Sequence, residues 1–360
     1  MFHYRFNLLI LSFSASLIGC APPPFAKLSP ESDLAGSATE EQALTRRIDA
    51  VLETAKDARL LSTDRNAAWQ IMHAVICYGP ELKIDTPDRG IVSALDYAFT
   101  EGLINGFELM PGAQLPSGKK GLKARLEPGS YEGQGHVDQW IAILAMADVP
   151  AKTQITVNGE AFSVEDLARQ AQFDAPYNML DEFSWTLIAL CHYFPDESSW
   201  TAAEELELTW ETLVEQELLQ DIDYSPCGGT HRLAGLVAAL NAKSRLELPD
   251  SETWKQAAEK VHNHFAKVKA SRGADGRLTS LYFTGSGKVA DLAGELASTG
   301  HLFEFVALAA DDQQIQEDWI ALAASHLCGL IEQTEHLDLD CGALYHALHG
   351  LKIYRSRIKS

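Results

Sequence analysis

Two short segments of the chain place a thiol and an imidazole close to glycines. The segment CGGTHR carries Cys227 and His231, and the segment DCGALYH carries Cys341 and His346. Cysteine and histidine are the ligands that zinc prefers in proteins. His301, in the segment ASTGHLFEF, is a further donor of the same kind. The residue types therefore predict a metal site, with zinc as the candidate ion, formed by Cys227, His231, His301 and Cys341.

The same segments also hold groups for acid–base chemistry without a metal. A polysaccharide lyase needs a tyrosine and a histidine that move a proton and an arginine that neutralises a uronate, and a glycoside hydrolase needs two separated carboxylates. Asp138 is a further carboxylate for the second reaction. The candidate catalytic residues are His136, Glu182, His231, Arg232, His301, Glu304, Tyr345 and His346.

The thiols of Cys227 and Cys341 have a second interpretation, a disulfide between them. Cys77, Cys191 and Cys328 lie in apolar helical segments, where cysteine behaves as a small hydrophobic residue. Cys227 and Cys341 each precede a glycine instead, so they form either metal ligands or a disulfide with each other. Five cysteines after the N-terminal one is an odd number, so at least one thiol stays free or binds a ligand.

The N-terminal residues predict an exported protein. Residues 1–19 have a polar start with Arg5 and an apolar run too short to span a membrane, as in a signal peptide. The ending LIGC resembles the lipobox of bacterial lipoproteins, which implies lipidation of Cys20 and anchoring in the outer membrane. Residues 20–40 are rich in Pro, Ser and Ala, which favours a tether, and residues 41–360 form the folded domain.

The charge of the chain excludes one class of partner. The formal net charge is −21, and removal of the signal peptide with Arg5 leaves 28 basic and 50 acidic residues, a charge of −22. Such a chain is repelled by nucleic acid and by anionic lipid headgroups. We therefore expect no nucleic-acid partner, a membrane contact through the lipid alone, and a small-molecule, glycan or apolar ligand.

The elements that must position these residues are almost all helical. Apolar residues recur at helical spacing, and Thr201, Ser163 with Asp166, and Ser251 are predicted N-caps. An Asn-Gly pair at 158–159 predicts a minor hairpin over 153–162. The predicted helices cover residues 40–60, 65–78, 89–104, 135–147, 163–174, 181–194, 202–220, 229–242, 251–270, 298–310, 313–332 and 341–356.

These helices alternate between two kinds. One kind carries charge on one face, and the other, such as RLAGLVAALN, is apolar nearly all round and must be enclosed. The regular alternation predicts an all-α fold, an α/α toroid of about six inner–outer helix pairs. Parallel inner helices bring their N-termini together, so the polar segments at those starts should meet in one cavity. Glycines at 133, 135, 228, 229, 300 and 342 should let the backbone approach a ligand there.

A family resemblance supports this fold. The segment SRGADGRLTSLYF, residues 271–283, resembles the Asp-Gly-aromatic turn of squalene–hopene cyclases, and the pattern over residues 65–356 is similar to bacterial lipoproteins with an α/α toroid. Protein prenyltransferases, which are also α/α toroids, hold zinc with Asp, Cys and His. The segment DLDC, residues 338–341, has Cys341 where the Asp-x-Asp-Asp motif of a cyclase has its last Asp, which disfavours cyclase chemistry but leaves binding of an apolar ligand open.

The functional hypothesis has two forms. The first is a lipid-anchored enzyme, either a metal-dependent hydrolase or transferase or a carbohydrate-active lyase or hydrolase, acting on an envelope or extracellular substrate. The second is a binding or scaffold lipoprotein without catalysis. Convergence of His136, His231 and His301 would favour the enzyme. We expect the other histidines to be packing or surface residues, namely His73, His192, His262, His264, His326 and His349.

Overall fold

The computed structural model describes residues 30–178 and 182–358. The chain divides into two units, Met1–Glu41 and Gln42–Ser360. The predicted signal peptide, Cys20 and the first part of the predicted tether lie outside the described residues. Helix α1, Pro30–Ala58, begins before the predicted helix start at residue 40, and residues 30–40 of the predicted tether lie in this helix. None of the described helices is long and apolar enough to cross a membrane.

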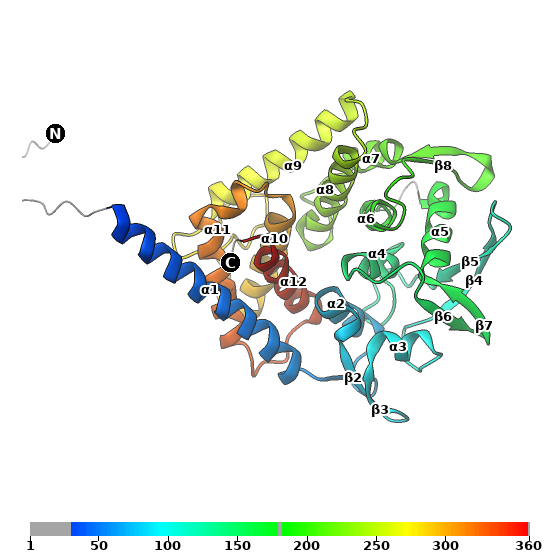
Figure 1. Ribbon diagram of the computed structural model, residues 1–360, viewed down its shortest axis with the longest axis horizontal. Helices are drawn as coiled ribbons and strands as arrows, with labels where there is room; N and C mark the ends of the chain where they lie inside the picture. Colours follow the sequence, from blue (N-terminus) through cyan, green and yellow to red (C-terminus); the bar gives the residue numbers. More distant parts are fainter. Residues whose placement is uncertain (1–29, 179–181, 359–360) are drawn as a thin grey trace, which may run out of the picture. The chain divides into compact units, whose positions relative to one another are not determined.

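The unit Gln42–Ser360 is mainly helical, and six of its helices pack in a continuous series. Each even-numbered helix contacts the next one, and α12 also contacts α2, so the contacts return to their starting point (Figure 1). We call these six the inner helices. They are α2 (Ala68–Tyr78), α4 (Gln139–Met146), α6 (Ser184–Tyr193), α8 (Thr230–Arg245), α10 (Leu292–Ala309) and α12 (Cys341–Arg357).

The inner helices are enclosed, as their apolar composition predicted. All residues from 298 to 307 in α10 and from 342 to 351 in α12 are buried, which requires neighbours on every side. Glycines allow these two helices to approach closely. A Cβ atom on Gly300 would lie 2.7 Å from the Cβ atom of Ala347, and one on Gly350 would lie 2.9 Å from the Cα atom of Glu304.

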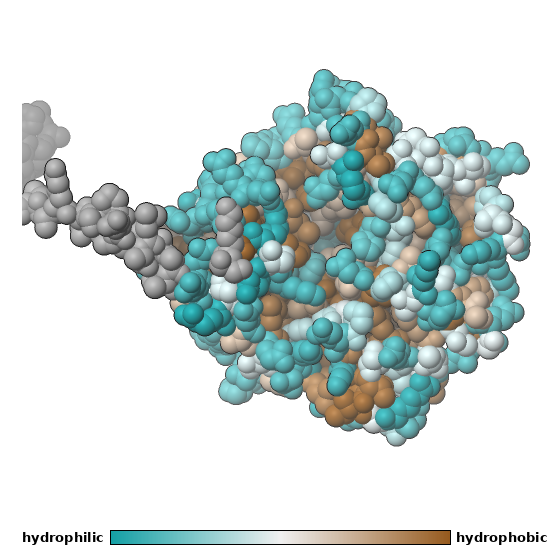
Figure 2. All heavy atoms as spheres, in the orientation of Figure 1, coloured by the Kyte–Doolittle hydropathy of each residue, from teal (hydrophilic) through white to brown (hydrophobic). Residues whose placement is uncertain are grey.

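Amphipathic helices pack on the outside of the inner helices. They include α5 (Val164–Asp174), α7 (Trp210–Leu218), α9 (Glu252–Ser271) and α11 (Asp318–Gln333), and each contacts two inner helices. In α9 the buried residues Trp254, Ala257, Val261, Phe265 and Val268 form one stripe at helical spacing. Hydrophilic side chains cover the outward side of this helix (Figure 2). Ser251 caps α9 by accepting a hydrogen bond from the backbone of Trp254, as predicted.

Three outer helices are each preceded by a two-stranded hairpin. The pairs are β2 (Lys83–Thr86) with β3 (Gly90–Ser93), β6 (Gln154–Val157) with β7 (Glu160–Ser163), and β8 (Ser199–Thr201) with β9 (Glu207–Thr209). In each hairpin the last residue of the second strand, Ser93, Ser163 or Thr209, is the N-cap of the helix that follows. The predicted hairpin at 153–162 and the capping box of Ser163 with Asp166 are confirmed.

The other two hairpins correct the predicted helices 89–104 and 202–220. The structure has β3 and the short helix α3 (Ala94–Phe99) in the first range, and β9 before α7 in the second. Thr201 pairs with Glu207 in a strand and is no helix cap. The backbone reverses at positive φ at Glu204 and Glu205, which is incompatible with a continuing right-handed helix.

Two further pairings complete the strands of the described chain. Strand β1 (Leu61–Ser62) runs parallel to β2, and β4 (Leu109–Gln114) pairs with β5 (Lys120–Ala124) in an antiparallel hairpin. The fold is therefore mostly α, with four small sheets where we expected one minor hairpin.

Candidate functional site

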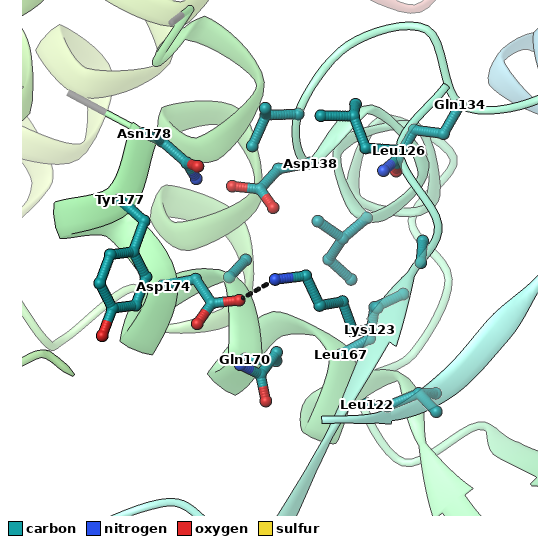
Figure 3. Close-up of a pocket in the computed structure, with 14 residues that line it drawn as sticks. Leu122, Lys123, Leu126, Gln134, Asp138, Leu167, Gln170, Asp174, Tyr177 and Asn178 are labelled. Atoms are coloured by element: carbon teal, nitrogen blue, oxygen red, sulfur yellow. Dashed lines mark hydrogen bonds and ion pairs between the residues drawn. The ribbon is translucent and has the colours of Figure 1, made fainter. Parts of the chain in front are cut away.

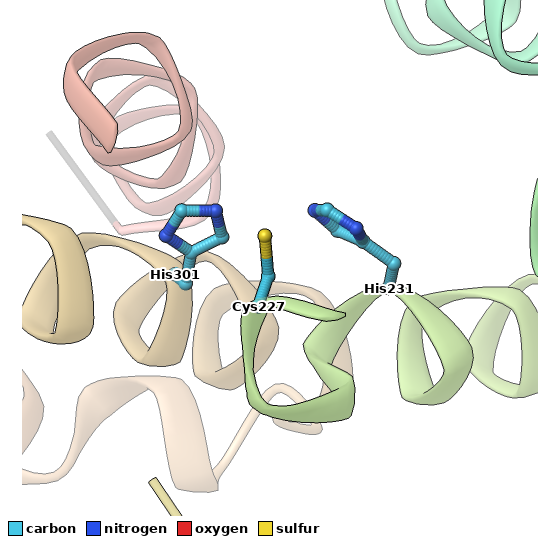
Figure 4. A group of neighbouring side chains, drawn as sticks. All are labelled: Cys227, His231 and His301. Carbon is cyan, nitrogen blue, oxygen red and sulfur yellow. The ribbon is translucent and has the colours of Figure 1, made fainter. Parts of the chain in front are cut away.

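Side chains from two inner helices and the turn before one of them meet at one point. His231 lies in the first turn of α8, Cys227 lies in the 3₁₀ turn η4 (Pro226–Gly229) before it, and His301 lies in α10. One ligand atom from each of the three lies within 4.8 Å of the others. Figure 4 shows the thiol between the two imidazoles. This group contains three of the four predicted metal ligands.

The segment CGG needs its glycines because the turn before α8 is left-handed. Cys227, Gly228 and Gly229 have φ values of 51°, 62° and 77°. A Cβ atom on Gly228 would overlap the ring of Tyr282, and one on Gly229 would lie 2.5 Å from the carbonyl oxygen of Ile222. Only glycine fits at both positions, and the turn places the Cys227 thiol beside His231. Burial raises the pKa of this thiol to about 12.

The two imidazoles of this group keep buried nitrogen atoms without partners. His301 Nδ1 donates to the carbonyl oxygen of Ala297 at 2.7 Å, so its Nε2 is left as an acceptor. Neither ring nitrogen of His231 has a hydrogen-bond partner among the described residues. The Nε2 atom of His301 has none there either. Burial lowers the pKa of both rings, that of His231 well below the ordinary value. Both rings are therefore neutral at pH 7.

His346 on α12 lies against both of these rings. Its ring centroid is 4.5 Å from that of His301 and 4.9 Å from that of His231. Its Nδ1 donates to Glu304 Oε2 at 2.7 Å, and His349 Nδ1 donates to Glu304 Oε1 at 2.5 Å. Burial alone would raise the pKa of the Glu304 carboxyl, but the two imidazoles outweigh it and hold that pKa well below its ordinary value.

A second polar pair lies at the more exposed side of the site. His136 Nδ1 is 3.1 Å from Glu182 Oε2, and the Ser184 hydroxyl donates to Glu182 Oε1 at 2.6 Å. Burial would raise the pKa of Glu182, but the hydrogen bonds from His136 and Ser184 and the charges of His136 and Arg232 together outweigh it, and the pKa is lowered. The ring of His136 is 6.4 Å from that of His231, and the indole of Trp185 contacts both. Of the three histidines predicted to converge within metal-ligand distance, His231 and His301 do so, whereas His136 lies beside them and outside the group.

Three predicted site residues lie elsewhere. Arg232 NH1 donates to both carboxylate oxygens of buried Glu217 at 2.9 Å and does not face the imidazoles. The ring of Tyr345 packs against Tyr78, with centroids 6.2 Å apart. Cys341 does not belong to the group formed by Cys227, His231 and His301. Cys341 and Cys227 are both free thiols, so the alternative of a disulfide between them is wrong. These side chains point away because neighbouring residues of one helix face different directions.

The position of His301 differs from the prediction. Helix α10 begins at Leu292, where Asp291 accepts a hydrogen bond from the backbone of Gly294, so His301 lies in the third turn and not at a helix start. Gly300 serves the contact between α10 and α12 rather than a ligand's approach to the backbone. The site is thus built partly from the middle of an inner helix.

Asp138 belongs to a separate pocket of about 100 Å³ between α4, α5 and β5 (Figure 3). It is the N-cap of α4 with φ 57°, and the hydroxyl of Thr186 donates to its carboxylate at 2.6 Å. Burial raises its pKa to about 6. Lys123 and Asp174 form an ion pair of 2.7 Å in the same pocket. None of Cys227, His231, His301 and His346 lines it.

Sequence reasoning missed one histidine of the site, and a second histidine packs against it. His349, expected to be a packing residue, donates to Glu304, and the ring of His73 lies 5.5 Å from that of His346. Burial lowers the pKa of His73 to about 3. The spacing of His346 and His349, three residues apart on one predicted helix, was a signal that both face the same neighbour. Comparison of the chain with protein-family models, with curated proteins and with solved structures finds no match.

Proposed function

We propose that this chain is an exported, lipid-anchored enzyme that uses a divalent metal ion, with zinc as the first candidate, to hydrolyse a small neutral substrate. Cys227, His231 and His301 hold the ion. One observation carries the proposal: buried ring nitrogens of His231 and His301 that have no partner lie within 4.8 Å of a thiol and of each other. Buried polar atoms are rarely left unpaired, and a metal ion would satisfy these.

The donor set fits such an ion. Imidazole nitrogens and a cysteine sulfur suit zinc, and the hydrogen bond of His301 Nδ1 to the Ala297 carbonyl directs Nε2 toward the site. The thiol loses its proton on coordination, which offsets the effect of burial on its pKa. Three protein ligands leave a position for water or substrate, as in catalytic sites.

The chain's own residues supply the remaining parts of a hydrolytic site. A bound divalent ion lowers the pKa of water and polarises a carbonyl or phosphoryl group. His136, oriented by Glu182 at 3.1 Å, is the partly exposed histidine next to His231 and takes up the proton that the attacking water releases. Trp185 fills the space between these two rings and keeps the donors in place.

The geometry favours this reaction over a polysaccharide lyase. The guanidinium of Arg232 is engaged by Glu217 and by the hydroxyl of Ser225 at 2.7 Å, so it does not neutralise a uronate. Tyr345 packs against Tyr78 and is not next to the imidazoles. The carboxylates Glu182 and Glu304 lie at the site, and they repel an anionic substrate. A neutral substrate avoids this repulsion.

Burial of the donors favours a second candidate, a metal-binding protein without catalysis. The exposed fractions of His231, His301 and His346 are 6%, 5% and 1%. Structural metal sites are closed, whereas catalytic sites keep an open position. The cobalt-substituted protein distinguishes the two when it is titrated with imidazole, a neutral ligand. An open position binds imidazole and changes the visible spectrum, and an unchanged spectrum would indicate the closed site.

The fold and location are part of the same proposal. The contacts that lead from α2 through α12 and back to α2 support an α/α toroid, in which the amphipathic helices form the outer layer. The segment LIGC supports lipidation of Cys20 and an outer-membrane location.

The test of the metal site is elemental analysis of the full-length chain, purified in detergent without chelators. We expect one zinc or related ion per chain, and its loss in Cys227→Ser and His231→Ala. Cys341→Ser is the matched control, because that thiol lies outside the group, and it should keep the metal. A wild-type chain that binds no divalent ion after incubation with zinc would refute the proposed function.

A further inference from the structure

We infer that His346 is a fourth protein ligand of the metal and that Glu304 and His349 are positioning residues that hold it. The inference rests on the metal site of the proposed function and extends it. The resulting donor set is one thiolate and three imidazoles, with a buried carboxylate behind the third imidazole. Because four protein ligands close a tetrahedral site, this set favours the second candidate of the proposed function, the metal-binding protein without catalysis.

The first step is the geometry between α10 and α12. Glu304 on α10 accepts one hydrogen bond at each carboxylate oxygen, from His346 Nδ1 at 2.7 Å and from His349 Nδ1 at 2.5 Å. The two histidines are three residues apart and share one face of α12. The close helix contact at Gly300 and Gly350 brings that face onto Glu304. The carboxylate therefore fixes the orientation of both rings.

The second step concerns the other nitrogen of His346. Because Nδ1 is occupied by Glu304, Nε2 is the atom left for a ligand, and it is buried without a hydrogen-bond partner among the described residues. Its ring lies 4.5 and 4.9 Å from those of His301 and His231. Its nitrogen atoms lie outside the group of ligand atoms that are within 4.8 Å of one another, so coordination requires the ring to move closer to the other three donors. An imidazole with a carboxylate on one nitrogen and a free second nitrogen is a common arrangement for a metal ligand.

The third step is the balance of charge. Glu304 is buried, and its ion-pair partners in the described part of the chain are the two imidazoles. A divalent ion bound at Nε2 of His346 would satisfy that buried nitrogen and would place positive charge near the buried carboxylate. Its two positive charges balance the Cys227 thiolate and the Glu304 carboxylate.

His73 supports the same arrangement from the opposite side. Its Nδ1 is bonded to the carbonyl oxygen of Trp69 at 2.6 Å, and its ring packs edge-on against His346 at 5.5 Å. The ring of His346 is thus held between the site and a second buried imidazole. His73 itself is a packing residue in this arrangement, because its ring approaches His346 and not the Cys227 thiol.

The experiment measures zinc affinity of the full-length chain by competition with a chromophoric chelator. We expect His346→Gln to weaken zinc binding by about 100-fold or more, and Glu304→Gln and His349→Gln by about 10- to 100-fold, which is the usual effect of a residue behind a ligand. Glu295→Gln is the matched control. Glu295 also bonds a histidine between two helices, His326 at 2.7 Å, and its substitution should leave the affinity unchanged.

X-ray absorption of the zinc-loaded wild-type chain gives a second measurement that needs no variant. Three imidazoles and one sulfur around the ion support the inference. Two imidazoles with one sulfur and a solvent oxygen would overturn it while leaving the proposed metal site intact, as would an unchanged affinity in both His346→Gln and Glu304→Gln. A wild-type chain without zinc affinity would instead refute the proposed function, and the two failures are therefore distinct.

Discussion

At the residue scale, the buried charged side chains Glu217 and Arg232 lie near the site and are paired with each other. The Glu217 side chain is fully buried and accepts hydrogen bonds from Arg232 and from the backbone N–H of Phe183. Arg232 also contributes to the lowered pKa of Glu182, which binds His136. The ion pair thus fixes the segment that leads into α6 and, through it, the pair of His136 and Glu182.

Arg232→Met should destabilise the fold strongly. The substitution leaves the Glu217 carboxylate buried without its counter-charge, which costs about 3–5 kcal/mol. Urea unfolding measures the change. Arg125→Met is the control, since the ion pair of Arg125 with Glu108 is on the surface, and it should produce no measurable change. Equal effects of the two substitutions would contradict the assigned role of the buried pair.

Asp138 makes the stability depend on pH. Its pKa is about 6 in the folded chain and about 4 when unfolded, because burial penalises the charged form. The folded state therefore holds the proton more tightly, and stability falls as the pH rises from about 4 to about 6. Asp138→Asn keeps the acceptor for Thr186, tolerates the left-handed backbone and removes the charge.

We expect Asp138→Asn to gain about 1–2 kcal/mol relative to wild type between pH 4 and pH 7, less than a full two-unit shift because the side chain is partly exposed. The measurement is the free energy of unfolding of both proteins at several pH values. A difference that stays constant over this range would show that the carboxyl titrates normally.

At the element scale, the contact between α10 and α12 positions His301, Glu304, His346 and His349 together. Gly300→Ala places a methyl group 2.7 Å from the Cβ atom of Ala347, so the helices must separate. We expect a loss of about 1–3 kcal/mol in unfolding free energy and weaker zinc binding. Gly329→Ala in α11 is the control. There the nearest atom is a guanidinium nitrogen of Arg47 at 3.3 Å, an approach that a shift of a few tenths of an ångström relieves, so alanine should cost less than at Gly300 and leave zinc binding unchanged.

The three hairpins that precede α3, α5 and α7 show when a local sequence pattern is sufficient to predict a hairpin. The Asn-Gly turn at 158–159 marks one hairpin clearly, since both residues accept positive φ. The hairpin before α7 turns at Glu204 and Glu205, residue types that normally favour a helix. Its strands are three residues each, too short for a period of two to be distinguished from helical spacing.

At the scale of the whole molecule, the acidic charge and the N-terminal segment predict how the chain meets the membrane. A chain of net charge −21 has no electrostatic attraction to anionic lipid, so the proposed anchor is the lipid on Cys20 alone. Cys20→Ser should abolish incorporation of labelled palmitate and move the protein out of the membrane fraction. Cys341→Ser is the control and should remain labelled. A Cys20→Ser variant that stays in membranes would mean that another segment anchors the chain.

Helical content, the enclosed character of the inner helices and most candidate residues were predictable from the sequence. Apolar periodicity and the composition of each segment reflect burial directly, so α8, α9 and α12 begin within a residue of the predicted starts. The proximity of His231 and His301 was also predicted, but for a different reason from the one that produces it, because His301 lies in the third turn of α10 and not at a helix start.

The direction of each side chain was decided only by tertiary structure. Tyr345 and His346 are neighbours in the sequence, yet one packs against Tyr78 and the other bonds Glu304. Their separation depends on the rotation of α12 about its axis, which follows from the close contacts of Gly350 with Glu304 and of Gly300 in α10 with Ala347. Residue types therefore determined which chemistry was available, and helix packing determined which of those residues share a site.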